Sequence, residues 1–214
     1  MKVILTGVTG FVGEGVLFEC LENAAVASVL SVSRRRYGLE HPKLRECVVA
    51  DFRDVAAVEA ELTGFDACFY CAGISSRGLS EATYTEITYD TPLSFAKTLL
   101  RLNPGMVFCH ISGSHTDGSE KGRVMWARVK GKAENALAAL PFKAVYNFRP
   151  GLMKPFANQK NVKGVFRVVS ALYPALNLIF PGLTLSELGR AMVHCASGGA
   201  AKAVLEPKDI KALA

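Results

Sequence analysis

The sequence predicts an α/β fold in which a doubly wound parallel sheet carries helices on both faces. Short apolar runs of strand length alternate with longer segments of helical periodicity from residue 2 to residue 148. This alternation is typical of parallel strands joined by crossover helices. Half of the 214 residues are hydrophobic, which is enough for one sizeable core. Because no linker interrupts the chain, we expect a single domain over residues 1–214.

The first strand, residues 2–6, runs into a glycine-rich turn and then into a helix over residues 14–23. The glycines stand three residues apart, allow a tight reversal and let a ligand approach the backbone closely. The helix start offers N–H groups and a positive dipole end to a pyrophosphate. This context predicts a Rossmann-like dinucleotide-binding turn, with a bare turn as the alternative. The predicted binding residues are Gly7, Thr9, Gly10, Phe11, Val12 and Gly13.

The second strand, residues 26–33, ends in Ser33 and a run of three arginines. In a dinucleotide-binding fold, an acidic residue at this strand end would bind the ribose 2′-hydroxyl of NAD, whereas a basic residue accommodates the 2′-phosphate of NADP. The strand end has no acid, so Ser33, Arg34 and Arg35 predict NADP(H) rather than NAD(H). The alternative is a solvated basic loop.

The third strand, residues 47–50, is followed by Asp51 and Phe52, which we expect beside the adenine. Asp51 would alternatively, or in addition, cap a helix over residues 55–62. The fourth strand, residues 65–71, ends in a small, glycine-containing loop suited to close passage of a cofactor. The predicted cofactor contacts there are Cys71, Ala72 and Gly73.

Cys68 and Cys71 have the spacing of a redox or zinc pair. Positions three apart in a strand face opposite sides of the sheet, and no second pair completes a metal site. We therefore expect two separate strand cysteines and no metal.

A long helix is expected over residues 81–102, and a strand over residues 106–111 that exits into a polar loop beginning at Ser112. That loop is the expected substrate edge, because ligands of open α/β sheets bind beyond the carboxyl ends of the strands. A helix over residues 128–140, beginning as early as residue 122, precedes a strand over residues 144–148.

After Gly151 the regularity weakens, and residues 151–214 are expected to form a substrate-side or lid segment within the same domain. The expected elements are a loop over 156–163, a broken helix over 165–178, an amphipathic helix over 185–197 capped by Thr184, an edge strand over 202–205 and a helical turn over 207–213.

With these residues assembled, the chain resembles the short-chain dehydrogenase/reductase superfamily, and most closely its atypical or extended branch of NAD-dependent epimerase/dehydratase-like proteins. The resemblance covers residues 1–151 well and the remainder loosely. It depends on the glycine turn, Asp51, the loop after the fourth strand and Ser112. The remaining motifs are residues 126–130 and Arg149-Pro150-Gly151, of which Pro150 and Gly151 are expected at the cofactor.

The resemblance implies a Ser, a Tyr and a Lys as catalytic residues, the last two on one helix face. Ser112, or alternatively Ser114, matches the serine, and Lys130 matches the lysine that binds the nicotinamide ribose. Trp126 occupies the tyrosine position, and its indole N–H is neither an acid nor a base near neutral pH. The candidate replacements for the proton donor are Tyr84, Tyr89 and His115.

The leading expectation is a cytoplasmic NADP(H)-binding reductase or epimerase-type oxidoreductase that acts on a small, apolar, carbonyl-type ligand. The second is a non-catalytic NADPH sensor that contacts another protein. A homodimer through the two long helices is a further expectation. The net charge of +6 comes without a nucleic-acid motif, and no apolar run reaches the length of a membrane span.

Overall fold

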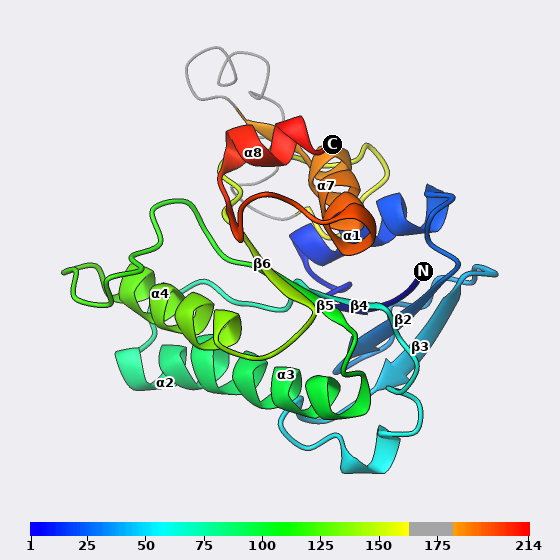
Figure 1. The fold of residues 1–214 in the computed structure, drawn as a ribbon, viewed down its shortest axis with the longest axis horizontal. Helices are drawn as coiled ribbons and strands as arrows, with labels where there is room; N and C mark the ends of the chain where they lie inside the picture. Colours follow the sequence, from blue (N-terminus) through cyan, green and yellow to red (C-terminus); the bar gives the residue numbers. More distant parts are fainter. Residues whose placement is uncertain (163–181) are drawn as a thin grey trace.

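The structure is a computed structural model that describes residues 1–162 and 182–214. Within these two ranges, seven parallel strands form the central sheet in the order β3-β2-β1-β4-β5-β6-β9 (Figure 1). The strands are β1 (Lys2–Thr6), β2 (Ser28–Ser33), β3 (Leu44–Val48), β4 (Ala67–Tyr70), β5 (Val107–Ile111), β6 (Ala144–Phe148) and β9 (Val204–Leu205). A separate parallel pair joins β7 (Met153–Lys154) to β8 (Leu183–Thr184). The predicted doubly wound parallel sheet is confirmed.

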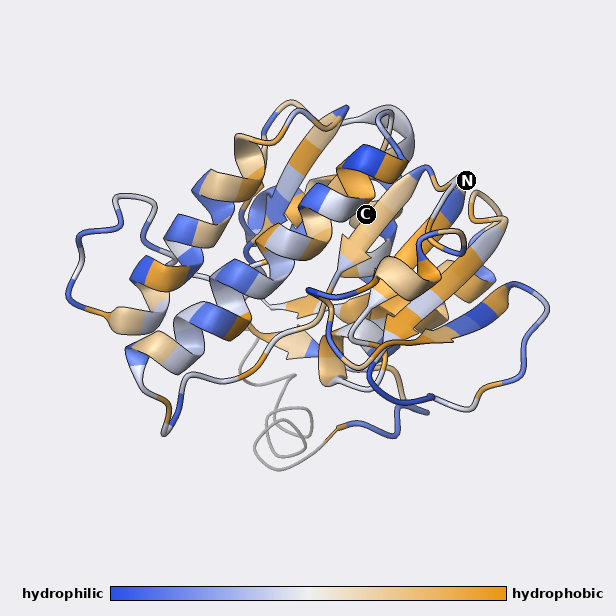
Figure 2. Cartoon of the chain, turned by 90° about the horizontal axis from the view of Figure 1, so that it is seen from below, coloured by the Kyte–Doolittle hydropathy of each residue, from blue (hydrophilic) through white to orange (hydrophobic). Residues whose placement is uncertain are grey.

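Helices cover both faces of the sheet (Figure 1). One face carries α1 (Phe11–Glu22), α7 (Leu185–Gly198) and α8 (Pro207–Ala212). The other carries α2 (Glu81–Thr85), the π-helical turn η2 (Glu86–Asp90), α3 (Thr91–Leu102) and α4 (Met125–Ala138). Apolar residues are concentrated in the strands, whereas the helices mix apolar and polar residues along their length (Figure 2). The apolar faces of the helices are therefore buried on the sheet.

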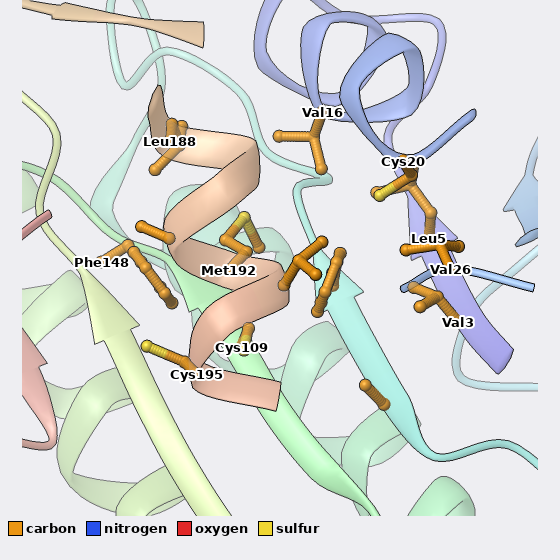
Figure 3. Close-up of a cluster of buried hydrophobic side chains, with 14 of the residues drawn as sticks. Val3, Leu5, Val16, Cys20, Val26, Cys109, Phe148, Leu188, Met192 and Cys195 are labelled. Atoms are coloured by element: carbon orange, nitrogen blue, oxygen red, sulfur yellow. The ribbon is translucent and has the colours of Figure 1, made fainter. Parts of the chain in front are cut away.

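Two buried clusters, one on each face, make up the core. On the α1/α7 face, Leu188 and Met192 of α7 lie over Cys109 and Phe148 of the sheet (Figure 3). All six cysteines are free thiols. Cys68 and Cys71 belong to opposite clusters, as the strand periodicity predicts.

The helix predicted over residues 55–62 is wrong. Among these residues the structure has only the 3-10 turn η1 (Ala56–Val58), and the apolar residues at the two ends of the predicted range, Val55 and Leu62, are buried. A segment of this length gains too few hydrogen bonds to offset helix nucleation, so the burial of its two apolar ends decides its shape. The third strand is also displaced, since β3 begins three residues before the predicted range 47–50 and ends inside it, at Val48.

The long helix predicted over residues 81–102 is present as three consecutive helical pieces, α2, η2 and α3. Pro92 lies in the first turn of α3, where its missing N–H interrupts the α-helical ladder. Thr184 caps α7 as predicted, in a full capping box with Glu187. The loop over 156–162 is confirmed, and the broken helix expected over 165–178 lies outside the described residues.

Candidate nucleotide site at the switch point of the sheet

The chain order reverses between β1 and β4, and the loops that follow the first four strands surround one cleft. The cleft has a volume of about 480 Å³. Its lining residues are Gly7, Thr9, Gly10, Ser33, Arg34, Arg35, Phe52, Cys71, Ala72 and Gly73. Each of them lies at or after the carboxyl end of a parallel strand, which is where open α/β sheets bind ligands. The loops after four separate strands are thus brought together as the sequence predicts.

The glycine turn packs against the end of β4 so closely that side chains are excluded. Gly7 has φ +75°, and a Cβ there would lie 2.7 Å from the backbone nitrogen of Ala72. A Cβ on Gly13 would overlap the Gly7 carbonyl. Phe11, Val12 and Gly13 form the first turn of α1 and are not among the lining residues. They support the turn, whereas Gly10, the N-cap of α1, faces the cleft.

Thr6 is a site residue that the sequence analysis missed. Its buried hydroxyl oxygen accepts hydrogen bonds of 3.1 Å from the backbone N–H groups of both Cys71 and Ala72. The bonds fasten the end of β1 to the loop after β4. The polar residue at the end of an otherwise apolar strand was the available signal.

The arginine loop, residues 34–38, is held by several hydrogen bonds. Ser33 donates from its hydroxyl to the Arg35 carbonyl at 2.6 Å. Glu46 accepts from the backbone N–H groups of Tyr37 and Gly38. Arg34 and Arg35 are exposed and are among the residues that line the cleft.

A second hollow of about 360 Å³ shares Arg34, Phe52, Ala72 and Gly73 with the first. Asp51 lines it and accepts from the backbone and guanidinium of Arg53, which holds the pKa of Asp51 below its usual value. Arg53 also pairs with Glu86 across the hollow. The predicted capping role of Asp51 is wrong, because the helix that it would cap is absent and the 3-10 turn has no side-chain cap.

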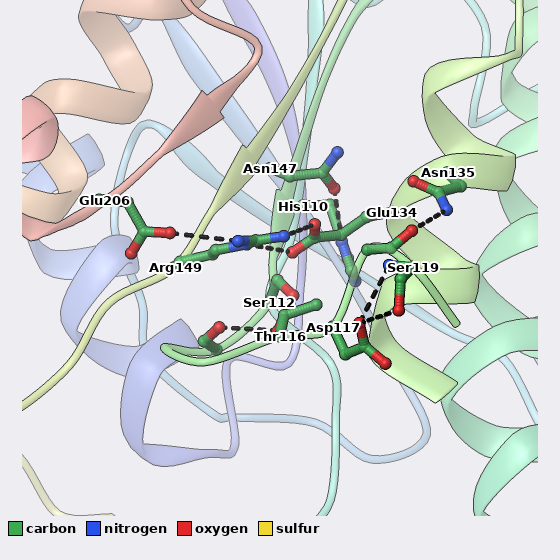
Figure 4. Close-up of polar contacts among 12 residues, drawn as sticks. His110, Ser112, Thr116, Asp117, Ser119, Glu134, Asn135, Asn147, Arg149 and Glu206 are labelled. Atoms are coloured by element: carbon green, nitrogen blue, oxygen red, sulfur yellow. Dashed lines mark hydrogen bonds and ion pairs between the residues drawn. The ribbon is translucent and has the colours of Figure 1, made fainter. Parts of the chain in front are cut away.

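Ser112, Trp126 and Lys130 are brought together around Gly113. A Cβ on Gly113 would lie 3.8 Å from Trp126 Cζ3 and 3.7 Å from Lys130 Cδ. Ser112 and Thr116 share a hydrogen bond of 3.1 Å, and the Thr116 hydroxyl donates to the Gly113 carbonyl at 2.7 Å (Figure 4). Because the Thr116 hydrogen is used there, Ser112 is the donor in the shared bond, and a lone pair of its oxygen is left for a ligand.

Lys130 and His110 line a narrow crevice of about 10 Å³ that continues from Ala72 and Gly73. Burial lowers the pKa of Lys130 to about 8, while the Glu134 carboxylate acts in the opposite direction. Burial and then the Lys130 charge lower the pKa of His110 to about 3, and its Nδ1 lies 2.9 Å from Asn147 Oδ1. His110 is therefore neutral at physiological pH, and Lys130 is mostly charged below pH 8.

The motif at residues 149–151 borders this region through two sets of contacts. Ser114 donates from its hydroxyl to the Pro150 carbonyl at 3.2 Å, and a Cβ on Gly151 would lie 3.3 Å from the same hydroxyl oxygen. Arg149 forms a bidentate pair with the buried Glu134 and reaches Glu206 at 3.2 Å (Figure 4). Ser114 thus joins the loop after β5 to the loop after β6.

The three candidate replacements for the tyrosine lie away from the lining of these hollows. Tyr84 is buried, with a hydrogen bond to Thr88. Tyr89 lies beneath the Lys132 ammonium, 4.3 Å from it to the ring centroid. His115 is exposed at φ 64°. None of them contributes to the described cleft or crevice.

Within residues 1–162 and 182–214, no three His, Cys, Asp or Glu side chains are placed to share a metal ion. Nor does any helix there combine the length and the apolar character needed to cross a bilayer.

Solved structures with the same architecture include dehydratases and epimerases. A DesIV double mutant (dTDP-glucose 4,6-dehydratase) from Streptomyces venezuelae, with NAD and DAU bound, superposes with a TM-score of 0.68 at 18% identity, covering 96% of this chain and 75% of that one. MoeE5 in complex with UDP-glucuronic acid and NAD gives 0.69 at 19% identity, covering 96% and 76%. These likenesses show the fold.

Curated relatives are similar over part of their length. Protein fmp52, mitochondrial, of Emericella nidulans is 28% identical over 157 residues, which are 71% of this chain and 66% of that protein. An uncharacterized protein of Mycobacterium tuberculosis is 26% identical over 113 residues, 53% of this chain and 12% of that protein. The family model of the NAD dependent epimerase/dehydratase family matches residues 3–129, more than half of the 214 residues. The chain therefore belongs to the NAD dependent epimerase/dehydratase family.

Proposed function

We propose that this protein binds NADP(H) in the cleft at the switch point and is an oxidoreductase of the epimerase/dehydratase type with an altered proton-transfer site. The observation that carries the proposal is the position of Arg34 and Arg35, whose side chains line the cleft beside the glycine turn. Among the described lining residues of that cleft, none is acidic. A guanidinium pair at this place favours a 2′-phosphate over a 2′-hydroxyl.

The residues present fit a dinucleotide. The turn excludes side chains at Gly7 and Gly13, and the N-cap of α1, Gly10, has no capping side chain, so a pyrophosphate would take the place of a cap. The hollow beside Asp51 and Phe52 would receive the adenine. The backbone at Cys71, Ala72 and Gly73 would border the middle of the cofactor, and Pro150 and Gly151 its nicotinamide end. When bound, the nicotinamide supplies or accepts a hydride.

The protein's own groups would hold the reacting end and a substrate. Lys130 would donate to the nicotinamide ribose, and its charge would favour the phosphates below pH 8. Ser112, whose hydrogen is donated to Thr116, would accept a hydrogen bond from a hydroxyl group of the substrate or product. Trp126 occupies the position at which the resemblance predicts a proton donor. Its indole N–H donates hydrogen bonds but does not release a proton near neutral pH. Proton transfer would therefore depend on water or on the substrate itself.

The test is a titration of the protein with NADPH and, in parallel, NADH, followed through the fluorescence of Trp126, the single tryptophan. We expect NADPH to bind more tightly. Replacing Arg34 and Arg35 together by Ala should weaken NADPH binding about 100- to 10,000-fold, since each of the two charge-assisted bonds contributes on the order of 1.5–3 kcal/mol, and should leave NADH binding nearly unchanged. Arg36→Ala is the matched control, because Arg36 belongs to the same loop and does not line the cleft. Equal losses for both cofactors would refute the 2′-phosphate assignment.

A second function, that of a non-catalytic NADPH sensor, is favoured by Trp126 at the proton-donor position. Such a protein would bind NADPH as above and change its contacts with a partner. Consumption of NADPH with any member of a carbonyl substrate panel would exclude the sensor. Binding without turnover over the whole panel would favour it.

We propose further that the ligand is a small, apolar, carbonyl-type molecule and not a nucleic acid. The chain forms one domain, with residues 151–214 on the substrate side. The protein is located in the cytoplasm. The protein either forms a homodimer through α3 and α4 or binds a regulatory protein partner.

A further inference from the structure

A carboxylate joins the glycine turn to two distant parts of the chain. Glu14, in the first turn of α1, is fully buried. Its Oε1 accepts from the Tyr37 hydroxyl at 2.8 Å and from the Lys160 backbone N–H at 2.9 Å. Its Oε2 accepts from the Asn161 backbone N–H at 2.8 Å and from the Gln159 amide at 3.4 Å.

All four partners of Glu14 are donors, so the site requires a carboxylate and not merely a polar group. An amide at this position would turn its NH₂ group toward a backbone N–H, that of Lys160 or that of Asn161, whichever way it is placed. Gln159 strengthens the connection, because its amide also donates to the Phe11 carbonyl at 2.9 Å.

Tyr37 connects Glu14 to the arginine loop. Its backbone N–H is held by Glu46, and its ring lies 6.0 Å from the Lys160 ammonium, measured to the ring centroid. The hydroxyl bond to Glu14 is therefore the contact through which the segment that carries Arg34 and Arg35 is fixed to the start of α1. One carboxylate holds both the arginine loop and residues 159–161.

We propose that Glu14 and Tyr37 are positioning residues that determine cofactor specificity, and that they couple occupancy of the 2′-phosphate subsite to the order of residues 159–161. The inference rests on the proposed function. Closing of Arg34 and Arg35 on a 2′-phosphate stabilises the Tyr37 position, which in turn stabilises the Glu14 bonds to Lys160 and Asn161. Binding in the cleft is thereby transmitted to the segment that follows β7.

The first test is Tyr37→Phe, which keeps the ring and removes one hydroxyl. The ratio of NADH to NADPH dissociation constants should fall about 5-fold or more, as expected for loss of a bond to a charged group, while NADH affinity stays within about 2-fold. Tyr89→Phe is the matched control and should leave the ratio unchanged. An unchanged ratio in Tyr37→Phe, in a protein whose wild type prefers NADPH, would overturn the positioning role alone. A wild type without NADPH preference would overturn both this role and the 2′-phosphate assignment.

The second test measures amide hydrogen exchange at Lys160 and Asn161. In the wild type, NADPH should slow exchange at these amides more than NADH does, and in Tyr37→Phe the two cofactors should have the same effect. Glu14→Gln should abolish the difference too, with circular dichroism used to verify that it folds. Equal effects of the two cofactors in an NADPH-preferring wild type would refute the coupling.

Discussion

Trp126 and Lys130 lie one helical turn apart on α4 and face the same backbone at Gly113. The geometry of the tyrosine–lysine pair is thus retained, while the residue that would exchange a proton is not. Burial lowers the pKa of Lys130 to about 8, so its charge is present at pH 7 and is lost as the pH rises through 8. At neutral pH that charge would lower the pKa of a phenol placed beside it.

Trp126→Tyr should therefore raise carbonyl reduction at pH 7. General acid catalysis contributes about 10²–10⁴-fold, so we expect at least a tenfold gain in turnover with a responsive carbonyl substrate, and little change in NADPH affinity. Trp126→Phe serves as the control, because it removes the indole without adding an acid. Equal turnover in the Tyr and Phe variants would show that the missing proton donor does not limit the reaction.

At the level of elements, the glycines of α1 and α7 let these helices cross closely over the sheet. A Cβ on Gly15 would lie 2.6 Å from Leu185 Cδ1, and one on Gly189 would lie 2.6 Å from Glu19 Cβ. Gly15 follows the binding turn by two residues. The contact that supports the start of α1 is thus made by a helix from the other end of the chain.

Gly189→Ala should lower the free energy of unfolding by about 1–3 kcal/mol, the usual cost of inserting a methyl group into a packed contact. Chemical denaturation measures this directly. Gly198→Ala is the matched control on the same helix, since a Cβ there would lie 3.9 Å from its nearest neighbour, His194 Nε2. A gain in stability in both variants would show that the two helices adjust without cost.

For the whole molecule, the buried His110 links stability to pH. Burial and the Lys130 charge lower its pKa to about 3 in the folded state, against an ordinary value of 6.5. Between these two values the unfolded chain binds a proton that the folded chain does not. Stability is therefore lost as the pH falls from 6.5 toward 3.

The free energy of unfolding should fall by about 1.4 kcal/mol per pH unit from His110 alone within this window. His110→Asn, whose amide reproduces the donor facing Asn147, should remove this slope between pH 6 and 4.5. His115→Asn is the control, because His115 is exposed and Asn tolerates its positive φ. Urea denaturation at several pH values provides the measurement, and an equal slope in the wild type and in His110→Asn would contradict the linkage.

Four features could be predicted from the sequence: the alternation of strands and helices, the glycine turn, the opposite orientation of Cys68 and Cys71, and the cap at Thr184. Each of these features depends on local periodicity or turn chemistry, and therefore on residues that are close together in the sequence. The sequence also located the cleft lining from Gly7 to Gly73, because parallel strands bring all their carboxyl ends to one edge. Where burial of two side chains outweighed local propensity, at residues 55–62, the prediction was wrong.

Only the tertiary structure decided which polar groups meet across long stretches of chain. Thr6 is 65 positions from Cys71, and Glu14 is 146 positions from Lys160. No local pattern marks such pairs, because a single threonine or glutamate could equally be exposed and make its hydrogen bonds to water. Folding selects their partners because a buried polar group must find a hydrogen bond wherever the packed chain offers one.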